Sequence, residues 1–213
     1  MDNFSEDSII LNSFFVRALQ DHESGPKALG WGSETSQKIR FRILCEIGNL
    51  NGKNILDFGC GFGDLYGFFT ENGKKNLGRY VGVDMNPFAI EKARQKYQGV
   101  EFRVGDYLAL KEFPEGSFDY VVASGVFNIE IPHWQQYTYA SLLEMYRVCK
   151  NAVGINFLNA QTILPKSEGS HYTDPCELLK FANSNLNFRS VLRQDYWPND
   201  FTMYIYKCLA EQQ

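Results

Sequence analysis

A long hydrophobic run is missing from this 213-residue sequence, and so is an excess of basic residues. No stretch approaches the ~18 apolar residues that a membrane-spanning helix needs. The 21 Lys and Arg are outnumbered by 25 Asp and Glu, and the net charge of −4 argues against a basic nucleic-acid-binding face. The first seven residues are acidic and lack the positive start of a signal peptide. We therefore expect a cytoplasmic protein with no membrane and no nucleic-acid partner.

Cysteine patterns typical of metal or redox sites are also absent. The five cysteines are scattered, and no two of them form a Cys-x-x-Cys pair, so neither a zinc site nor a redox-active dithiol is indicated. We expect reduced thiols and no metal site. The cysteines are Cys45, Cys60, Cys149, Cys176 and Cys208.

The composition that remains is that of a globular chain, with 44% hydrophobic and 22% charged residues. The length fits one domain with a full core, or one domain with a small cap. Helical spacing predicts helices over residues 8–19 and from Ser33, a good N-cap residue, to a stop at Gly48. We expect residues 1–50 to form an N-terminal helical cap and residues 51–213 to form the main domain.

From Lys53 onward, short apolar runs alternate with helical stretches. Several runs are apolar on both faces, which is typical of a parallel sheet covered by helices on both sides. The last two runs are joined only by residues 197–200, so they must form an antiparallel hairpin. The pattern predicts a doubly wound, seven-stranded, mostly parallel α/β sheet with an antiparallel last strand. The predicted strands are residues 54–58, 80–83, 100–104, 118–123, 152–158, 189–196 and 201–208, and a long helix is predicted over residues 133–150.

The strongest functional signal is the segment from Asp57 to Asp64, in which a strand runs into a glycine-rich turn and then a helix. In a doubly wound sheet, ligands bind beyond the carboxyl ends of the strands. Asp84 ends the next strand, where an acidic side chain can accept hydrogen bonds from both hydroxyls of a ribose. Together these features predict a nucleoside-binding site.

The spacing of the turn separates two kinds of nucleoside. A dinucleotide-binding turn, Gly-x-Gly-x-x-Gly, would need a glycine at position 64, which is Asp64 here. Carboxylates at Asp57 and Asp64 would repel a pyrophosphate at the helix N-terminus. S-adenosylmethionine carries an ammonium and a sulfonium and no phosphate, so it suits this site, whereas a nicotinamide oxidoreductase fits the sheet but not Asp64.

From about residue 50 to residue 208, the chain resembles the class I S-adenosylmethionine-dependent methyltransferases. The resemblance implies S-adenosylmethionine as cofactor, with N-terminal helices capping its site. It implies that the turn contacts the methionine moiety, that Asp84 binds the ribose, and that backbone carbonyls after the fourth strand lie near the ammonium and the methyl. It places three further residues around the adenine. The implied cofactor-binding residues are Asp57, Gly59, Cys60, Gly61, Gly63, Asp84, Met85, Asp106, Tyr107 and Ser124.

The segment from Gly30 to Phe41 is similar to a helix that precedes the glycine turn in a group of small methyltransferases. If this helix crosses the mouth of the cofactor site, Gln37 or Arg40 reaches the methionine carboxylate, which suits the bidentate fork of a guanidinium. Trp31 would then be a lid aromatic. The alternative is that Arg40 lies on a solvated helix face.

Methyl transfer needs a base only when the acceptor has a proton that must leave. Three candidates follow the fourth and fifth strands: His133, His171 and Glu130. His171 lies in the long loop over residues 160–173, and long loops of this kind are often lids. The alternatives are a surface role for His133 near a helix start, and a role for Glu130 as partner of a cationic substrate.

A small-molecule acceptor is the function we expect. The chain has no room for a separate target-recognition domain of ~100 residues, and no Asn-Pro-Pro-Tyr motif for base or amide methylation follows the fourth strand. Two alternatives stay open, a protein or RNA methyltransferase that uses a partner subunit and a binding protein that holds S-adenosylmethionine without transferring its methyl. The oligomeric state is left open.

Overall fold

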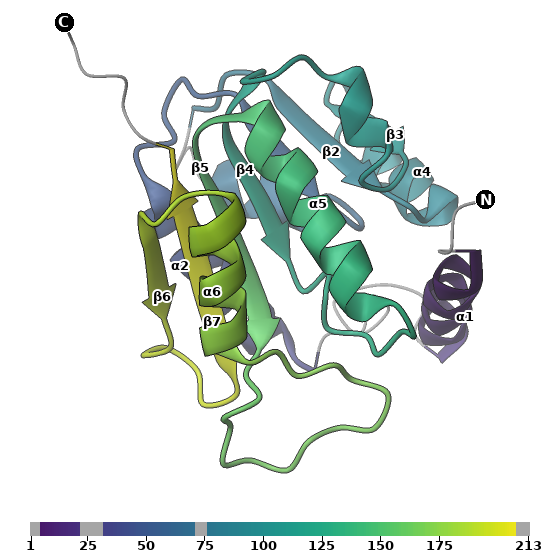
Figure 1. Ribbon diagram of the computed structural model, residues 1–213. Helices are drawn as coiled ribbons and strands as arrows, with labels where there is room; N and C mark the ends of the chain where they lie inside the picture. Colours follow the sequence, from purple (N-terminus) through teal and green to yellow (C-terminus); the bar gives the residue numbers. More distant parts are fainter. Residues whose placement is uncertain (1–4, 22–31, 71–75, 208–213) are drawn as a thin grey trace, which may run out of the picture.

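The computed structural model describes residues 5–21, 32–70 and 76–207, and its centre is one seven-stranded sheet (Figure 1). The strand order is β3-β2-β1-β4-β5-β7-β6. The first five strands are parallel, and β7 runs antiparallel to both of its neighbours. The predicted doubly wound sheet with an antiparallel last strand is therefore confirmed. The strands are β1 Ile55–Phe58, β2 Tyr80–Asp84, β3 Glu101–Val104, β4 Phe118–Ser124, β5 Cys149–Leu158, β6 Ser190–Arg193 and β7 Asp200–Tyr206.

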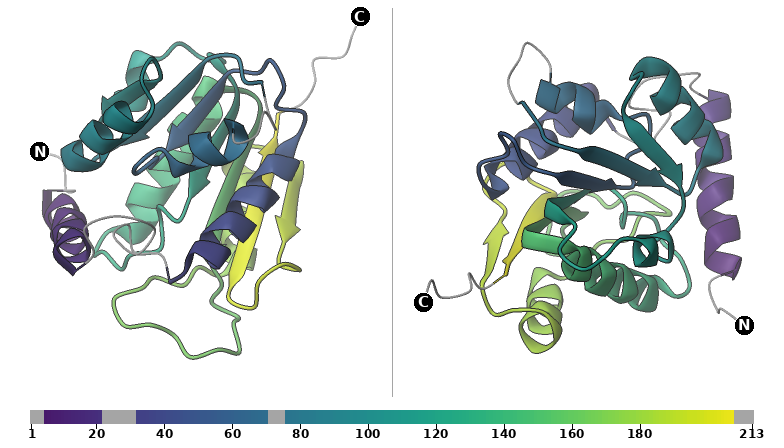
Figure 2. Two further views of the ribbon diagram at one scale, coloured as in Figure 1. Left: turned by 180° about the vertical axis from the view of Figure 1, so that it is seen from behind. Right: turned by 90° about the horizontal axis from the view of Figure 1, so that it is seen from above.

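Helices cover both faces of the sheet, and each face has its own apolar core. On one face α5 and α6 pack on side chains such as Leu56 and Val121. On the other face α2, α3 and α4 pack on side chains such as Ile55 and Val122, as the view from behind shows (Figure 2). Neighbouring residues of a strand alternate between the two cores, as the pleat requires. The helices are α1 Ser5–Asp21, α2 Glu34–Leu44, α3 Asp64–Thr70, α4 Pro87–Lys96, α5 Trp134–Val148 and α6 Pro175–Asn185.

Helix starts follow the capping residues that the sequence offers. The Ser33 hydroxyl accepts a hydrogen bond from the Ser36 amide, 3.1 Å away, as predicted. Asp174 caps α6 in the same way, and Pro175 occupies the first turn, where a missing amide hydrogen costs nothing. Tyr107 to Ser117 holds only the 3₁₀ turn Ala109–Glu112, which agrees with a segment too short for a crossover helix.

Several predicted boundaries are wrong. The helix expected to reach Lys150 ends at Val148, and β5 begins at the next residue, because Cys149 pairs with Phe118 across a register shift. The strand expected over residues 189–196 ends at Arg193, which folds back onto Asp195 in an ion pair of 2.8 Å. The helix expected to run to Gly48 gives way at Cys45 to a 3₁₀ turn.

Helix α2 is packed directly into the body of the protein. Phe41, Ile43 and Leu44 share a core cluster with Ile55 and with strand residues of β5 and β7. A hydroxyl from β7 also donates a 2.6 Å hydrogen bond to the carbonyl of Ile43. The division of the chain at residue 50 stays a prediction, but α2 is joined to the sheet by the same apolar packing as α3 and α4.

A buried ion pair fixes α2 to the start of β7. The Arg40 guanidinium contacts the Asp200 carboxylate through Nε–Oδ2 at 2.5 Å and Nη2–Oδ1 at 2.6 Å. The two side chains are 10% and 0% exposed. A bidentate pair of this kind has strict geometry, and removal of one partner leaves the other charge uncompensated.

We predict that Asp200→Ala destabilises the protein strongly, because it leaves the buried Arg40 guanidinium without its carboxylate. The free energy of unfolding should fall by about 3 kcal/mol, measured by urea denaturation. Asp195→Ala is the matched control, because it removes an ion pair at an exposed turn, and its unfolding midpoint should barely move. Equal midpoints for the two variants would contradict the assigned role of the buried pair.

Candidate functional site

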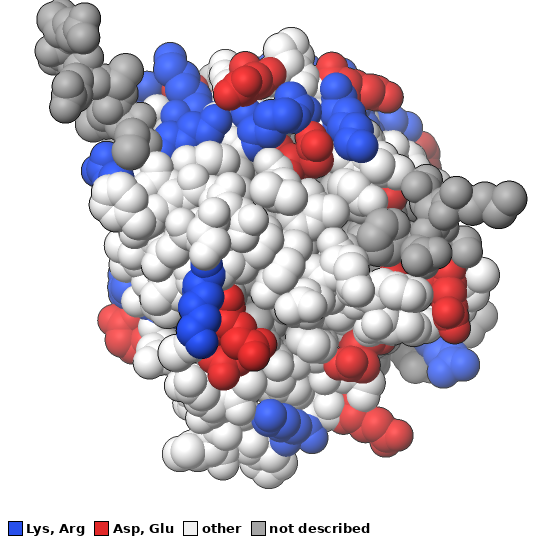
Figure 3. All heavy atoms as spheres, in the orientation of Figure 1, with Lys and Arg blue, Asp and Glu red and all other residues white. Residues whose placement is uncertain are grey.

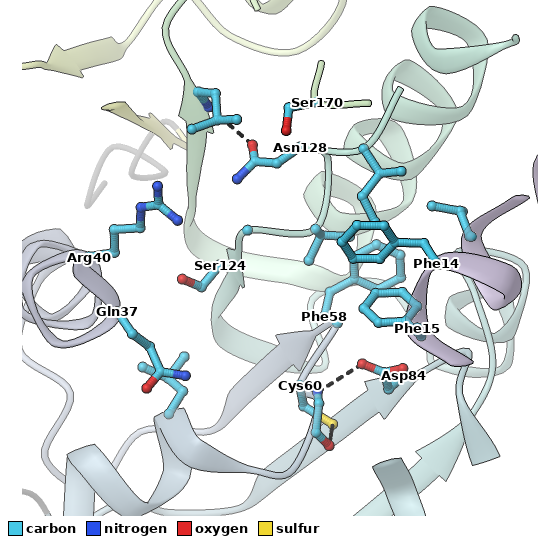
Figure 4. Close-up of a pocket in the computed structure, with 18 of the residues that line it drawn as sticks. Phe14, Phe15, Gln37, Arg40, Phe58, Cys60, Asp84, Ser124, Asn128 and Ser170 are labelled. Atoms are coloured by element: carbon cyan, nitrogen blue, oxygen red, sulfur yellow. Dashed lines mark hydrogen bonds between the residues drawn. The ribbon is translucent and has the colours of Figure 1, made fainter. Parts of the chain in front are cut away.

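A cavity of about 530 Å³ lies at the carboxyl ends of the parallel strands. The turn after β1 and the ends of β2, β3 and β4 line one side, and α1, α2, the loop after β5 and the loop between β6 and β7 also contribute (Figure 4). Side chains from segments far apart in the sequence therefore meet in one place. The residues that line the cavity include Leu11, Phe14, Phe15, Gln37, Arg40, Asp57, Gly59, Cys60, Gly61, Asp64, Asp84, Met85, Asp106, Ser124, Asn128, Tyr137, Ser170, Tyr172, Trp197 and Asn199.

The glycine turn brings backbone to the cavity wall. Gly59 and Gly61 have φ angles of 73° and 52°, which residues with a Cβ rarely adopt. A Cβ at Gly59 would also overlap the side chain of Val126. Gly63 also has a positive φ, but it packs against aromatic rings behind the turn and does not line the cavity. Gly59, Cys60 and Gly61 therefore give a ligand close access to main chain.

Asp84 is held in a fixed orientation at the end of β2. Its Oδ2 accepts a hydrogen bond from the Gly61 amide and its Oδ1 accepts one from the Asn86 amide, each at 2.8 Å. Burial raises the pKa of Asp84, while the two amides oppose that shift by stabilising the charged form. Each carboxylate oxygen has a second lone pair that can accept from a ligand. Met85 and Asp106 line the same part of the cavity.

Asp57 lies deeper, beneath the glycine turn. The Tyr80 hydroxyl donates a 2.5 Å hydrogen bond to its Oδ2. The pKa of Asp57 is raised to about 7, chiefly by burial; the Tyr80 hydrogen bond opposes the rise, and the charges of Asp84 and Asp64 add to it. A carboxyl group with such a pKa changes its charge near neutral pH, so the attraction of this wall for a cation depends on pH.

The two α2 residues predicted at the cofactor site both line the cavity. Gln37 donates to Asp64 at a distance of 3.4 Å, and Lys96 donates to the other oxygen of Asp64 at 2.7 Å. Arg40 is buried and neutralised by Asp200, so its placement on a solvated helix face is wrong. Gln37 and Arg40 are thus both present at the mouth, Arg40 as one half of an ion pair.

The three remaining residues predicted at the cofactor site differ in where they lie. Ser124 lines it, at the end of β4. Tyr107 is buried just behind the wall, edge-on to Tyr137 at 5.6 Å between ring centroids. Trp31 falls outside the residues that the structure describes.

The three predicted catalytic residues do not line the cavity. The His171 Nδ1 lies 2.8 Å from the Glu130 carboxylate, and its ring stacks on Trp134 with centroids 3.7 Å apart. His171 borders a separate, smaller cavity of about 260 Å³. His133 Nδ1 lies 3.3 Å from the buried Asp7 of α1. Their role as bases stays a prediction, and the contacts seen here are those of residues that join surface elements.

The roof of the cavity comes from α1, in agreement with the expected N-terminal helical cap, but its individual residues were not predicted. Leu11, Phe14 and Phe15 of α1 line it, and Figure 4 shows the two phenylalanines close to Asp84 and Phe58. α1 is attached through Asp7, whose carboxylate accepts from the His133 amide at 3.2 Å. Adjacent aromatics in a helix mark an apolar face, but nothing in the sequence says what that face covers.

The loop over residues 159–173 is pinned to the segment after β4. The His171 amide donates to the Asn128 carbonyl and the Glu130 amide donates to the Gly169 carbonyl, both at 3.0 Å. Ile129 and Ser170 form an antiparallel bridge between them. Ser170 and Tyr172 thereby become part of the cavity wall.

Residues 55–152 match a family described as "Methyltransferase domain". The matched segment holds the glycine turn and the fixed Asp84, which line one cavity. The chain belongs to the class I S-adenosylmethionine-dependent methyltransferases. This methyltransferase has no helix among its described residues that is long and apolar enough to cross a membrane.

Individual relatives agree with the family. The protein named "Putative methyltransferase Rv1506c" of Mycobacterium tuberculosis is 26% identical over 159 residues, which are 72% of this chain and 93% of that protein. The ribosomal protein L11 methyltransferase of Yersinia pestis is 36% identical over 99 residues, 46% of this chain but only 32% of that protein.

A solved structure shows the same fold. The 1,6-didemethyltoxoflavin-N1-methyltransferase of Burkholderia thailandensis, with 1,6-didemethyltoxoflavin and S-adenosylhomocysteine bound, superposes with a TM-score of 0.67 at 18% identity. The match covers 97% of this chain and 91% of that one.

The buried Asp57 generates a prediction about pH. Because only the ionised carboxylate attracts a cationic ligand, the affinity for S-adenosylmethionine should rise about tenfold between pH 6 and pH 8, measured by calorimetry. Asp57→Asn should remove this rise and leave only the ligand's own titration.

Tyr80→Phe makes the same prediction sharper. The Tyr80 hydroxyl stabilises the ionised Asp57, so its loss should raise the pKa of that carboxyl and move the midpoint of the affinity rise to higher pH. An unchanged midpoint in Tyr80→Phe would show that another group controls the pH dependence.

Proposed function

We propose that this methyltransferase transfers the methyl group of S-adenosylmethionine to a small-molecule acceptor bound in the same cavity. The observation that carries the proposal is Asp84, whose carboxylate is fixed by the Gly61 and Asn86 amides at the edge of the cavity. A dinucleotide would place a pyrophosphate beside Asp57 and Asp64, where two carboxylates oppose it. A ligand with a ribose, an ammonium and a sulfonium fits these same groups.

We assign each part of S-adenosylmethionine to a group of residues at the cavity wall. These residues together form the cofactor half of the cavity. The backbone of Gly59, Cys60 and Gly61 faces the methionine chain, and Asp84 accepts from the ribose hydroxyls. Asp57, with its negative charge, is placed to balance a ligand cation. The remaining assignments are Met85, Asp106 and Tyr107 around the adenine, Gln37 and Arg40 toward the methionine carboxylate, and Ser124 toward the reacting end.

The chain's own contribution to methyl transfer is position and exclusion of water. When bound, S-adenosylmethionine supplies an electrophilic methyl group whose sulfur departs without needing an acid. The walls from β1 to β5 and the roof from α1 hold the two reactants at one point and shield them from bulk solvent. Because His133, His171 and Glu130 lie outside the cavity, we propose an acceptor whose proton, where it has one, passes to water after methyl transfer, when the product leaves the cavity.

A small acceptor is supported by the enclosure of the site. A volume of about 530 Å³ lies in the usual range of small-molecule pockets. The loop over residues 159–173 and α1 both contribute to the lining, so a folded protein or RNA would have to displace them to reach the interior. The face drawn in Figure 3 mixes Lys and Arg with Asp and Glu at its upper end and is broadly uncharged in the middle, unlike a surface that binds a polyanion.

The likeness to the ribosomal protein L11 methyltransferase supports a protein acceptor as the second candidate. The two candidates differ in where a tritiated methyl group arrives. We expect label from S-adenosylmethionine to appear in a different small molecule of a cell extract, separated from the cofactor by chromatography of the ultrafiltrate. Label in the protein or RNA fraction would favour the second candidate.

Asp84→Asn tests the cofactor assignment. It replaces a charged acceptor by a neutral amide, so the affinity for S-adenosylhomocysteine should fall about 10- to 100-fold, measured by calorimetry. The matched control is Glu91→Gln, which makes the same carboxylate-to-amide change on α4 away from the cavity. NADH serves as the competing ligand, and binding of NADH in preference would overturn the proposal.

A further inference from the structure

The cavity has a second half that the cofactor assignment leaves unused. Figure 4 shows Asn128 and Ser170 on the opposite side from Cys60 and Asp84. Among the described lining residues, every carboxylate belongs to the cofactor half: Asp57, Asp64, Asp84 and Asp106. The lining of the second half is uncharged and includes the side chains of Asn128, Ser170, Tyr172, Trp197 and Asn199.

Asn128 is the most tightly held of these residues. Its side-chain Oδ1 accepts a hydrogen bond from the Leu158 amide at 3.0 Å, at the end of β5. Its main-chain carbonyl accepts from the His171 amide at 3.0 Å. The residue is thus fixed by β5 on one side and by the loop over residues 159–173 on the other.

These contacts determine which end of the Asn128 amide is offered to a ligand. A flipped amide would place its NH₂ group against the Leu158 N–H, two donors facing each other, so the observed orientation is the favourable one. The Nδ2 then remains as a hydrogen-bond donor, and Figure 4 shows it directed into the cavity. A fixed donor on a rigid frame selects a ligand atom with a lone pair.

We propose that Asn128 orients the methyl acceptor, and that the acceptor is an uncharged, planar compound whose carbonyl or ring nitrogen accepts from Asn128 Nδ2. The inference rests on the proposed function. A protonated amine would bring N–H groups against this donor and would find no carboxylate among the described lining residues of this half. The aromatic side chains of Tyr172 and Trp197 offer flat apolar surface for such a compound.

The reaction then balances without a base from the chain. A lone pair of the acceptor forms the new bond to the methyl carbon, the carbon–sulfur bond breaks, and its electron pair stays on sulfur. Any proton on the attacking atom leaves to solvent. Asn128 contributes orientation only, so it is a positioning residue that contacts the substrate.

Asn128→Asp separates this role from a structural one. The new carboxylate still accepts from the Leu158 amide and keeps the shape of the side chain, but it presents an acceptor and a negative charge to the cavity. Asn128→Ala would be less informative, because it leaves a backbone amide without a partner. The control is Asn185→Asp, the same change on the exposed end of α6.

The experiment uses wild type, Asn128→Asp and Asn185→Asp, each first titrated with S-adenosylhomocysteine by calorimetry. Saturation-transfer NMR on the loaded proteins then compares two probe sets, hydroxyquinolines with hydroxypyrimidines, and benzylamine with phenethylamine. Wild type and Asn185→Asp should bind the neutral heterocycles in preference. Asn128→Asp should bind them about tenfold more weakly, as expected for one lost hydrogen bond, and should gain affinity for the amines.

The proposed function and the role of Asn128 are contradicted by different results. If none of the three proteins binds S-adenosylhomocysteine, the proposed function itself is wrong. If all three bind it, the inference is overturned by a preference of wild type for amines, by binding of neither probe set, or by equal binding of the heterocycles to Asn128→Asp.

Discussion

The hydrogen bond from the Gly61 amide to the Asp84 carboxylate joins the ends of the two strands on which the site depends. It ties the turn after β1 to the last residue of β2, and the neighbouring Gly59 amide donates to the Val83 carbonyl at 2.7 Å. The turn can follow this path only because its glycines adopt positive φ. The position of Asp84, the shape of the turn and the depth of Asp57 beneath it are therefore one geometric unit, and the remaining walls are arranged around it.

Two polar contacts extend that unit to the ends of the chain. Arg40 joins α2 to β7, 160 residues away in sequence, and so closes the cavity on the side where α2, α3 and α4 cover the sheet. Asp7 joins α1 to the first residues of α5 and brings Phe14 and Phe15 over the opposite side. In both cases a buried carboxylate holds a helix that contributes to the cavity. The site is thus enclosed by the polar contacts of buried carboxylates at its rim and by apolar packing underneath.

The parts of the fold that the sequence predicts are those with local causes. Short apolar runs between helical stretches located all seven strands. Capping residues located the starts of α2 and α6, and glycine spacing located the turn beside Asp84. The boundary at Cys149 was missed because an apolar residue there satisfies the last turn of a helix and the first residue of a strand equally. An N-terminal helical cap was expected, but the α1 residues that line the roof, the Arg40–Asp200 pair and the fixed amide of Asn128 each depend on residues distant in sequence, which no local pattern records.

The pinned loop over residues 159–173 has a consequence for how such chains diverge. Its backbone is committed to residues 128–130 by main-chain hydrogen bonds that do not depend on the identity of the side chains. Side chains along the loop can therefore be exchanged while the wall keeps its course, and the glycine turn after β1 is untouched by such changes. In relatives of this chain, a change of methyl acceptor can therefore arise by substitution of side chains in this loop, because its position is held by backbone hydrogen bonds.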